Sequence, residues 1–237
     1  MQRYFAKNKQ NYVFELDSSD YYHIKTVMRM KDNDKIQIVY KKIVYMCHIE
    51  NVNNDIKVII DSVEVQKNNP TPTITLYLPL LKEQKFDFVL QKATELGIFE
   101  IVPLITERSI IKIDNEKYDK KITRWQKIVK EASEQSLRDE IPIITEIKNL
   151  KQLTKFEGLT ILCSTKEETL NINSLLKKNK KCDKINIVIG PEGGLSTKEE
   201  NFLIDLGASS TTLGNNIMRV ETVPIFLLSI INYEYME

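Results

Sequence analysis

The distribution of glycine is the feature that most constrains this chain. The sequence has only seven glycines, and five of them lie between Ile185 and Thr222, at Gly190, Gly193, Gly194, Gly207 and Gly214. Glycine permits positive φ and close approach of the backbone, so this concentration marks where the backbone passes near another group. The apolar run INIVIG (185–190) predicts a buried strand that enters a glycine-rich turn and then a helix. We therefore expect the chemistry to lie in this strand–loop–helix segment.

Composition excludes several classes of protein. With 237 residues, the chain suits one large domain or two small ones. No apolar run approaches the roughly 20 residues that cross a bilayer, and MQRYFAKNKQ lacks the apolar core of a secretory signal. The three cysteines are widely spaced with no CxxC, so neither a disulfide scaffold nor a metal site is indicated. These features favour a cytoplasmic protein that has no membrane segment and binds no metal. The net charge of +1 does not by itself indicate a nucleic-acid binder.

Two patterns divide the chain near the Asn68–Pro72 segment. Before it, Asn and Asp clusters separate a short helix at 18–29 from β-like runs at 35–40, 42–50 and 56–65, which predicts a small β-barrel module over residues 1–70. After it, strands alternate with helices, which predicts an α/β domain with a parallel sheet over residues 73–237. Its expected strands are 73–81, 100–106, 159–165, 185–190 and 211–214. Its expected helices are 82–96, 123–137 and 223–235. A further helix is expected to begin at a capping box, Ser196–Glu199, and to end at Gly207.

The GPEGG turn (190–194) allows three interpretations. It is a tight strand-to-helix turn, a phosphate cradle at a helix N-terminus, or a site where backbone groups hold a neutral or zwitterionic nucleoside. The spacing fits neither GxGxxG nor GxxxxGK[ST], and Glu192 would repel a polyphosphate. The second loop, 213–222, favours the nucleoside, since its apolar residues suit an adenine ring. Arg219 and Glu221 follow there, either as a structural ion pair or as reacting groups.

Four segments carry a resemblance to a known family. They are LQKATELGI (90–98), WQKIVKEASEQSLRDEIPII (125–144), IGPEGGLS (189–196) and LGNNIMRVET (213–222). In this order they resemble SPOUT-class methyltransferases, most closely the bacterial enzymes that methylate N3 of one uridine in small-subunit (16S) ribosomal RNA. HIKTVMRM (23–30) is similar to that family's RNA-binding, PUA-like module. The chain departs from the family pattern in two places. In the 213–222 loop and just after it, Met218 and Val223-Pro224 stand where the family more often has Leu before the Arg and Ala after the Thr, and the N-terminal module lacks the family's glycine turn.

The resemblance implies a fold, a cofactor and partners. The fold would be α/β, a parallel sheet with helices on both faces and a deep trefoil knot, plus a small PUA-like β-barrel; knots are otherwise rare. S-adenosylmethionine would lie in the knot of a homodimer that acts on ribosomal RNA. The implied cofactor pocket comprises Leu162, Cys163, Ser164, Ile189, Gly190, Glu192, Gly193, Leu213, Gly214, Ile217 and Met218.

The same resemblance implies that Arg219 and Glu221 face the reacting centre. On chemical grounds Glu221 is the first candidate for the base that removes the N3 proton, and Arg219 for the group that stabilises the anion on the uracil oxygens; solvent is the alternative for either role. The expected RNA contacts are Arg3, His23, Lys25, Arg29, Arg108, Lys112, Arg124 and Arg138. Three of these lie in the 108–130 stripe, where eight Lys and Arg against three acids give +5, although a solvated helix face explains such a bias equally well. Arg138 belongs to the Glu134–Arg138 segment, which the resemblance would put near the target base or the partner subunit.

Three rival functions remain open at this point. A ribose 2′-O-methyltransferase shares the fold but deprotonates a hydroxyl group, and the N-terminal module and the EASEQS segment (131–136) argue against it. A non-catalytic RNA-binding or ribosome-assembly protein is disfavoured by the intact GPEGG and MRVET loops. A sugar- or nucleotide-phosphate enzyme is disfavoured by the missing phosphate motifs.

Overall fold

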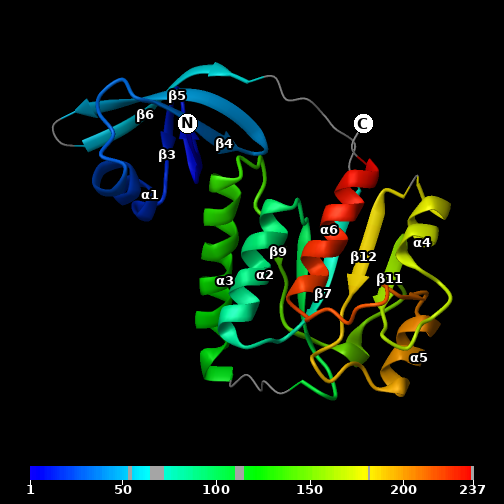
Figure 1. The fold of residues 1–237 in the computed structure, drawn as a ribbon. Coiled ribbons are helices and arrows are strands. Elements are labelled where there is room, and N and C mark those ends of the chain that lie inside the picture. The colour runs from blue at the N-terminus through cyan, green and yellow to red at the C-terminus, as the bar shows by residue number, and fades with distance from the viewer. Residues whose placement is uncertain (53–54, 65–71, 110–114, 181, 236–237) are drawn as a thin grey trace. The chain divides into compact units, whose positions relative to one another are not determined.

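A computed structural model describes residues 1–52, 55–64, 72–109, 115–180 and 182–235 (Figure 1). The chain divides into two compact units, the first comprising 1–69 with 133–141 and the second 70–132 with 142–237. The sequence pattern did not anticipate that 133–141 would group with the first unit. Among the described residues, no helix has both the length and the apolar character needed to cross a membrane.

The first unit is built on one mixed sheet. Its described strands are β1 (Gln2–Phe5), β2 (Asn8–Gln10), β3 (Val13–Glu15), β4 (Lys35–Tyr40), β5 (Ile43–Val52) and β6 (Asp55–Val63), in the order β1-β4-β5-β6-β3-β2. All neighbours are antiparallel except β1 and β4. Tyr4, Phe14, Ile36 and Val58 lie in its core, so the alternating runs of the sequence bury one face as expected.

Residues other than glycine make the turns of this unit. Asn33 has a φ of +69°, and the two-residue turn between β4 and β5 places Lys41 at +51° and Lys42 at +65°. The expected helix at 18–29 is shorter, with α1 (Ser18–Tyr22) running directly into a π-helical turn, η1 (His23–Val27). The backbone reverses at Arg29, where φ is +51°.

The second unit is a parallel sheet connected by helices. Its described strands are β7 (Thr73–Pro79), β8 (Glu100–Ile105), β9 (Ile143–Ile144), β10 (Lys148–Asn149), β11 (Leu159–Cys163), β12 (Lys184–Val188) and β13 (Ser209–Thr211). Their order is β10-β8-β7-β12-β11-β13, with β9 also beside β8, and every pair is parallel. The helices are α2 (Glu83–Glu95), α3 (Asn115–Gln135), the 3₁₀ turn η2 (Leu150–Gln152), α4 (Ile172–Lys178), α5 (Thr197–Asp205) and α6 (Thr222–Tyr235). The α/β prediction is confirmed.

Burial shows that the sheet is covered on both faces. On β12, every residue from Ile185 to Val188 is buried, although successive side chains point to opposite faces. Val188 belongs to a cluster with Leu203 of α5. Helices α2 and α3 pack together where the rings of Phe86 and Trp125 meet, with centroids 4.3 Å apart.

The expected fifth strand was misplaced. β13 covers Ser209–Thr211 and pairs with Ile161–Cys163, two residues earlier than the predicted 211–214. The prediction followed the apolar residues of TTLG, whereas the strand consists of half-buried serines and one buried threonine. The polar residues tolerate this position because β13 is the edge strand of the sheet.

Strand direction brings four chain segments to one edge of the sheet. Because β7, β12, β11 and β13 are consecutive and parallel, their carboxyl ends meet at the same edge. The start of α2, the GPEGG turn, Ser164 and the 212–221 loop follow these ends directly. In open α/β sheets this edge is where ligands bind. Strand order alone does not define a knot, which stays a prediction.

Candidate active site

The GPEGG turn is a compact reversal after β12. The Gly194 N–H donates to the Pro191 carbonyl at 2.8 Å, and Gly194 has a φ of +69°. A Cβ atom on Gly190 would lie 3.1 Å from both Cγ and N of Leu195, which is closer than a side chain normally approaches. Glycine at position 190 therefore lets the chain fold back tightly onto the start of α5.

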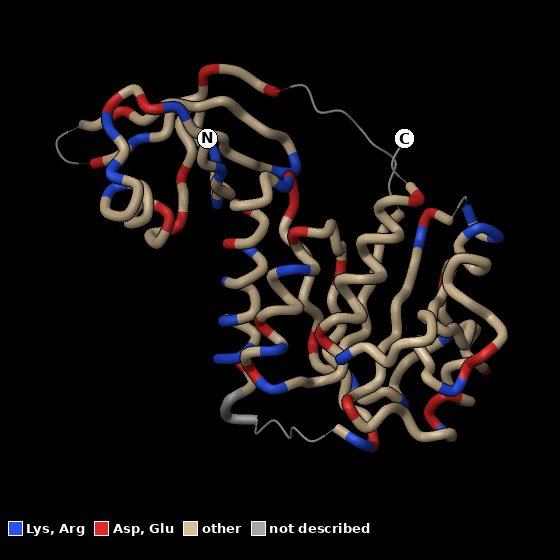
Figure 2. Tube along the Cα trace, viewed as in Figure 1, with Lys and Arg blue, Asp and Glu red and all other residues tan. Residues whose placement is uncertain are grey.

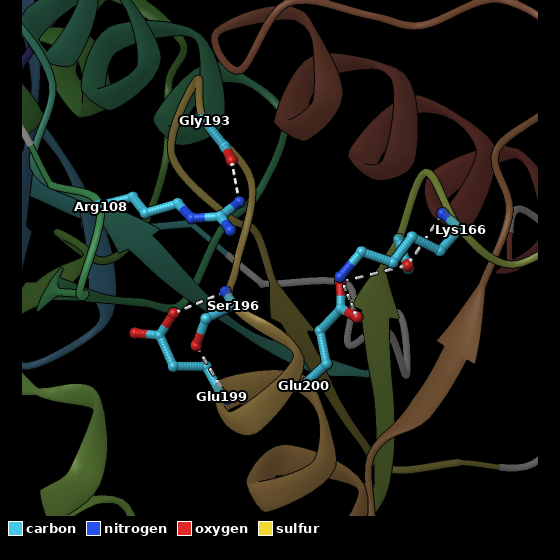
Figure 3. Close-up of polar contacts among 7 residues, drawn as sticks. Arg108, Lys166, Gly193, Ser196, Glu199 and Glu200 are labelled. Carbon is cyan, nitrogen blue, oxygen red and sulfur yellow. Dashed lines mark hydrogen bonds and ion pairs between the residues drawn. The ribbon is translucent and has the colours of Figure 1, made fainter.

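Two side chains hold the turn in place (Figure 3). Glu199 is 4% exposed, and its carboxylate accepts from the Ser196 N–H at 2.9 Å while the Ser196 hydroxyl accepts from the Glu199 N–H at 3.3 Å. The predicted capping box is thus present. The second Glu199 oxygen accepts from the Glu107 N–H at 2.8 Å, and Arg108 donates to the Gly193 carbonyl at 2.7 Å. The segment after β8 is thereby fastened to the turn.

The end of β11 forms a second wall beside this turn. Leu162 is buried, and burial raises the pKa of the Cys163 thiol to about 12, so that this thiol is an unreactive packing group. The Ser164 hydroxyl donates to Glu200 at 3.4 Å and accepts from the Lys166 N–H at 3.1 Å. Lys166 in turn pairs with Glu200 at 2.8 Å, which ties this wall to α5 (Figure 3).

The second loop lies between β13 and α6. Leu213 and Met218 are half-buried, whereas Ile217 is 84% exposed. Gly214 has a φ of +122°, and a Cβ atom there would meet nothing within 4 Å among the described residues. The loop ends where the Thr222 N–H donates to the Arg219 carbonyl at 2.9 Å at the start of α6.

Glu221 is the most unusual acid of the site. Its side chain is 16% exposed, and Lys85 Nζ lies 3.2 Å from Oε2. This is an ion pair and not an aligned hydrogen bond, and among the described residues no donor is aligned on this buried oxygen. Burial favours a higher pKa for Glu221, but its own backbone N–H, the contact with Lys85 and the charge of Arg219 outweigh burial and lower the pKa. Glu221 is therefore ionised and held close to a positive charge.

Sequence reasoning missed Lys85. It lies in the first turn of α2 and also donates to Glu192 at 3.4 Å, so that one ammonium group bridges both glycine loops. A signal was present, because a lysine in the first turn opposes the helix dipole and needs an acidic partner elsewhere in the fold.

The predicted RNA contacts of the first unit differ in environment. Arg3 is 8% exposed and its guanidinium already donates to Gln37 and to the Leu137 carbonyl, and burial lowers its pKa. His23 Nδ1 hydrogen-bonds the Tyr4 hydroxyl at 2.9 Å. Arg29 is exposed, and Lys25 is an exposed lining residue of a shallow pocket next to Tyr22.

The remaining predicted contacts come from residues 108–138, the stretch of sequence that includes α3. Lysines and arginines recur along this helix (Figure 2). Arg124 pairs with Glu83 and Asp87 of α2, so part of its charge is balanced. Burial lowers the pKa of Arg138, which is half-buried. Arg108 follows β8 and donates to the Gly193 carbonyl of the GPEGG turn, and Lys112 lies outside the described residues. Within the described part of the chain, no cluster of three His, Cys, Asp or Glu could hold a metal ion.

Comparisons with known proteins match this architecture. A model of the RNA methyltransferase domain family matches residues 67–232, and a model of the RNA methyltransferase PUA domain matches residues 16–61. Ribosomal RNA small subunit methyltransferase E of Bacillus subtilis is 32% identical over 249 residues, covering 99% of this chain and 97% of that relative. The enzyme of the same name from Mesomycoplasma hyopneumoniae is 34% identical over 233 residues, covering 97% and 98%.

A solved structure agrees with these relatives. The crystal structure of a ribosomal RNA small subunit methyltransferase E from Neisseria gonorrhoeae, bound to S-adenosyl methionine, superimposes with a TM-score of 0.87 at 25% identity, covering 98% of this chain and 97% of that one. Together, fold, loops and matches define the class as a PUA-containing RNA methyltransferase. The chain belongs to the ribosomal RNA small subunit methyltransferase E family.

Proposed function

We propose that this protein transfers a methyl group from S-adenosylmethionine to N3 of a specific uridine in small-subunit ribosomal RNA. Family membership supports the transfer to ribosomal RNA, since the relatives carry that activity in their names. The choice of N3 rests on the resemblance and on the chemistry of Glu221. We also propose a homodimer as the working unit, which accords with large apolar side chains exposed at Ile217 and Tyr233.

The residues at the carboxyl edge fit an uncharged nucleoside better than a polyphosphate. The tight Gly190 turn and the open space at Gly214 let backbone approach a ligand, and Leu213 and Met218 offer apolar contact. Glu192 projects from the same turn and would repel phosphate. Ile189, Gly193 and the Leu162–Ser164 wall complete the proposed pocket. When bound, the cofactor supplies an electrophilic methyl group on a sulfonium.

The observation that carries the proposal is the ionised carboxylate of Glu221, held 3.2 Å from Lys85 Nζ at the end of the second loop. N3 of uracil carries a proton, so its methylation requires that the proton be removed or that the anion be favoured. An ionised carboxylate whose side chain is 16% exposed can accept the proton of an N–H group in this position. We propose that Arg219, whose positive charge acts on Glu221, stabilises negative charge on the uracil oxygens.

The RNA must present the target base outside its helix. N3 lies on the Watson–Crick edge, so a paired uridine is inaccessible to Glu221. We propose that the first unit binds the surrounding RNA through Lys25 and Arg29, and that the exposed basic face of α3 contributes phosphate contacts. Arg3 and His23 hold internal hydrogen bonds, so their role in RNA binding requires these bonds to be exchanged.

The test compares ribosomal RNA from cells with and without the gene. Digestion and mass spectrometry should show one N3-methyluridine in small-subunit RNA that disappears on deletion. It should return with the wild-type gene and not with Glu221→Gln or Arg219→Ala. Each variant should bind S-adenosylmethionine within about threefold of wild type by calorimetry, because an interaction made only in the transition state affects turnover and not binding.

Two results would contradict the proposal. Loss of a 2′-O-methylated nucleoside in place of N3-methyluridine would assign the protein to the ribose-directed branch of the fold. Normal methylation by Glu221→Gln would remove this residue from the role of base.

A further inference from the structure

Lys85 occupies an unusual place in the second unit. It is the third residue of α2, and α2 follows β7, the strand beside β12. The positive end of a helix dipole lies at this N-terminus, so a lysine is electrostatically unfavourable there. Its Nζ atom instead reaches away to two carboxylates, Glu221 at 3.2 Å and Glu192 at 3.4 Å.

The two acids come from different loops of the site. Glu192 is part of the GPEGG turn after β12, and Glu221 ends the loop after β13. Without a cation between them, the two carboxylates would repel each other. The interaction with Glu221 and then that with Glu192 raise the pKa of Lys85, although burial opposes the rise, so Lys85 is charged at neutral pH.

We infer that Lys85 is a positioning residue for methyl transfer, which fixes Glu221 and Glu192 in one geometry and holds Glu221 as the acceptor of the substrate proton. This inference rests on the proposed function, because it assigns Lys85 a role through Glu221. The charged groups acting on Glu221 are then Lys85 from α2 and Arg219 from its own loop.

The geometry explains why a lysine suits this position. An ammonium group carries three donors around one point charge, so it can serve two carboxylates from different directions. One donor reaches Glu192 at 3.4 Å, and Nζ lies 3.2 Å from Oε2 of Glu221. The Glu221 carboxylate is thus held near a positive charge, and its side chain stays 16% exposed.

The experiment measures methyl transfer from radiolabelled S-adenosylmethionine to small-subunit ribosomal RNA particles by the full-length protein. The variants are Lys85→Ala, Lys85→Arg, Glu221→Gln and the Lys85→Ala/Glu221→Gln double variant. Lys92→Ala is the matched control, since Lys92 lies on the same helix, is 35% exposed against 32% for Lys85, and pairs with Glu95.

We expect Lys85→Ala to lower kcat about tenfold or more, a part of the roughly 10²- to 10⁴-fold that a positioned base contributes. The KM for S-adenosylmethionine should change less than about threefold, because ground-state binding is retained. Removing the positive charge raises the pKa of Glu221, so the acidic limb of kcat/KM should move to higher pH. Lys85→Arg keeps the charge and loses the compact ammonium geometry, so it should restore the wild-type limb and only part of the rate. Lys92→Ala should resemble wild type.

The double variant tests whether Lys85 acts through Glu221. If it does, the double variant should be no slower than Glu221→Gln alone, because residues that act as a unit are non-additive. If the losses of kcat in the two single variants multiply in the double variant, the inference is wrong. It is also wrong if Lys85→Ala has a kcat within twofold of wild type, or if the acidic limb of its kcat/KM profile does not move. Full activity of Glu221→Gln beside an impaired Lys85→Ala would also overturn it.

Failure of the proposed function is separately visible. The assay counts transferred methyl groups whatever their position, so the comparison among Lys85 variants holds for any methylated nucleotide. Nucleoside analysis of the same product tests N3-methyluridine itself.

Discussion

Glu199 offers the sharpest test of how the site is held together. Its carboxylate accepts from two backbone N–H groups, those of Ser196 at 2.9 Å and Glu107 at 2.8 Å. The first bond caps α5 beside the GPEGG turn, and the second fastens the segment that follows β8. Glu199→Ala removes both acceptors at once. We expect this single change to loosen two sides of the turn.

The size of the effect follows from the number of bonds. A hydrogen bond to a charged group contributes about 1.5–3 kcal/mol. Ser196 is half-buried and Glu107 is exposed, so water replaces part of each bond in the variant. Glu199→Ala should therefore cost about 2–4 kcal/mol. Glu199→Gln keeps the shape and one acceptor oxygen, so its cost should be about half of that.

The control is a second capping box with a neutral partner. Gln152 accepts one bond, from the Asn149 N–H at 2.9 Å, so Gln152→Ala should cost only about 0.5–1.5 kcal/mol. Urea unfolding monitored by circular dichroism gives all three values, and thermal scans should show a drop of about 2–4 °C per kcal/mol. If Glu199→Ala costs no more than Gln152→Ala, the double anchoring described here does not stabilise the turn.

Two further predictions concern stability. Gly158→Ala should cost about 2–5 kcal/mol, because φ is +80° and the new Cβ would lie 2.4 Å from the Lys184 carbonyl oxygen. Gly97→Ala has a similar φ of +89° but an open surrounding, so about 1 kcal/mol is expected, and equal losses in urea unfolding would refute the steric argument. Hydrogen bonds from the Thr169 side chain and from backbone N–H groups lower the pKa of Glu167 to about 2 from 4.5. Its stabilisation should be complete above pH 4.5 and disappear as the pH falls towards 2, so the difference in unfolding free energy between wild type and Glu167→Ala should shrink over that interval; a constant difference would contradict it.

Regular elements with strong local signals could be predicted from the sequence. The apolar face of 82–96 became α2 within one residue at each end, and the Ser196–Glu199 capping box opens α5 as expected. These predictions succeeded because periodicity and capping act over one or two helical turns. The strand predicted at 211–214 was misplaced. The residues that pair with β11 are polar, so the apolar pattern of the sequence did not identify them.

The site was predictable in outline and not in its connections. The two glycine loops could be predicted from the clustering of glycine in the sequence. The ion pairs from Lys85 to both loops could not, because they depend on β7 lying next to β12. Arg108 and Arg124 were grouped as basic residues of one stripe. In the structure Arg108 donates to the Gly193 carbonyl, whereas Arg124 pairs with acids of α2. Charge counts along a sequence do not reveal which charges are already balanced by tertiary partners.

The strand order also has a consequence for how this protein folds. β7 begins its pairing with β12 at Thr73 and Lys184, so the middle of the sheet joins residues more than a hundred positions apart. Pairings of such long range form slowly, because the intervening chain must be ordered before they are made. The loops that follow β7, β12 and β13 meet only after these pairings exist. Ligand affinity should therefore appear late in refolding, as one of the last properties of the native state to be regained.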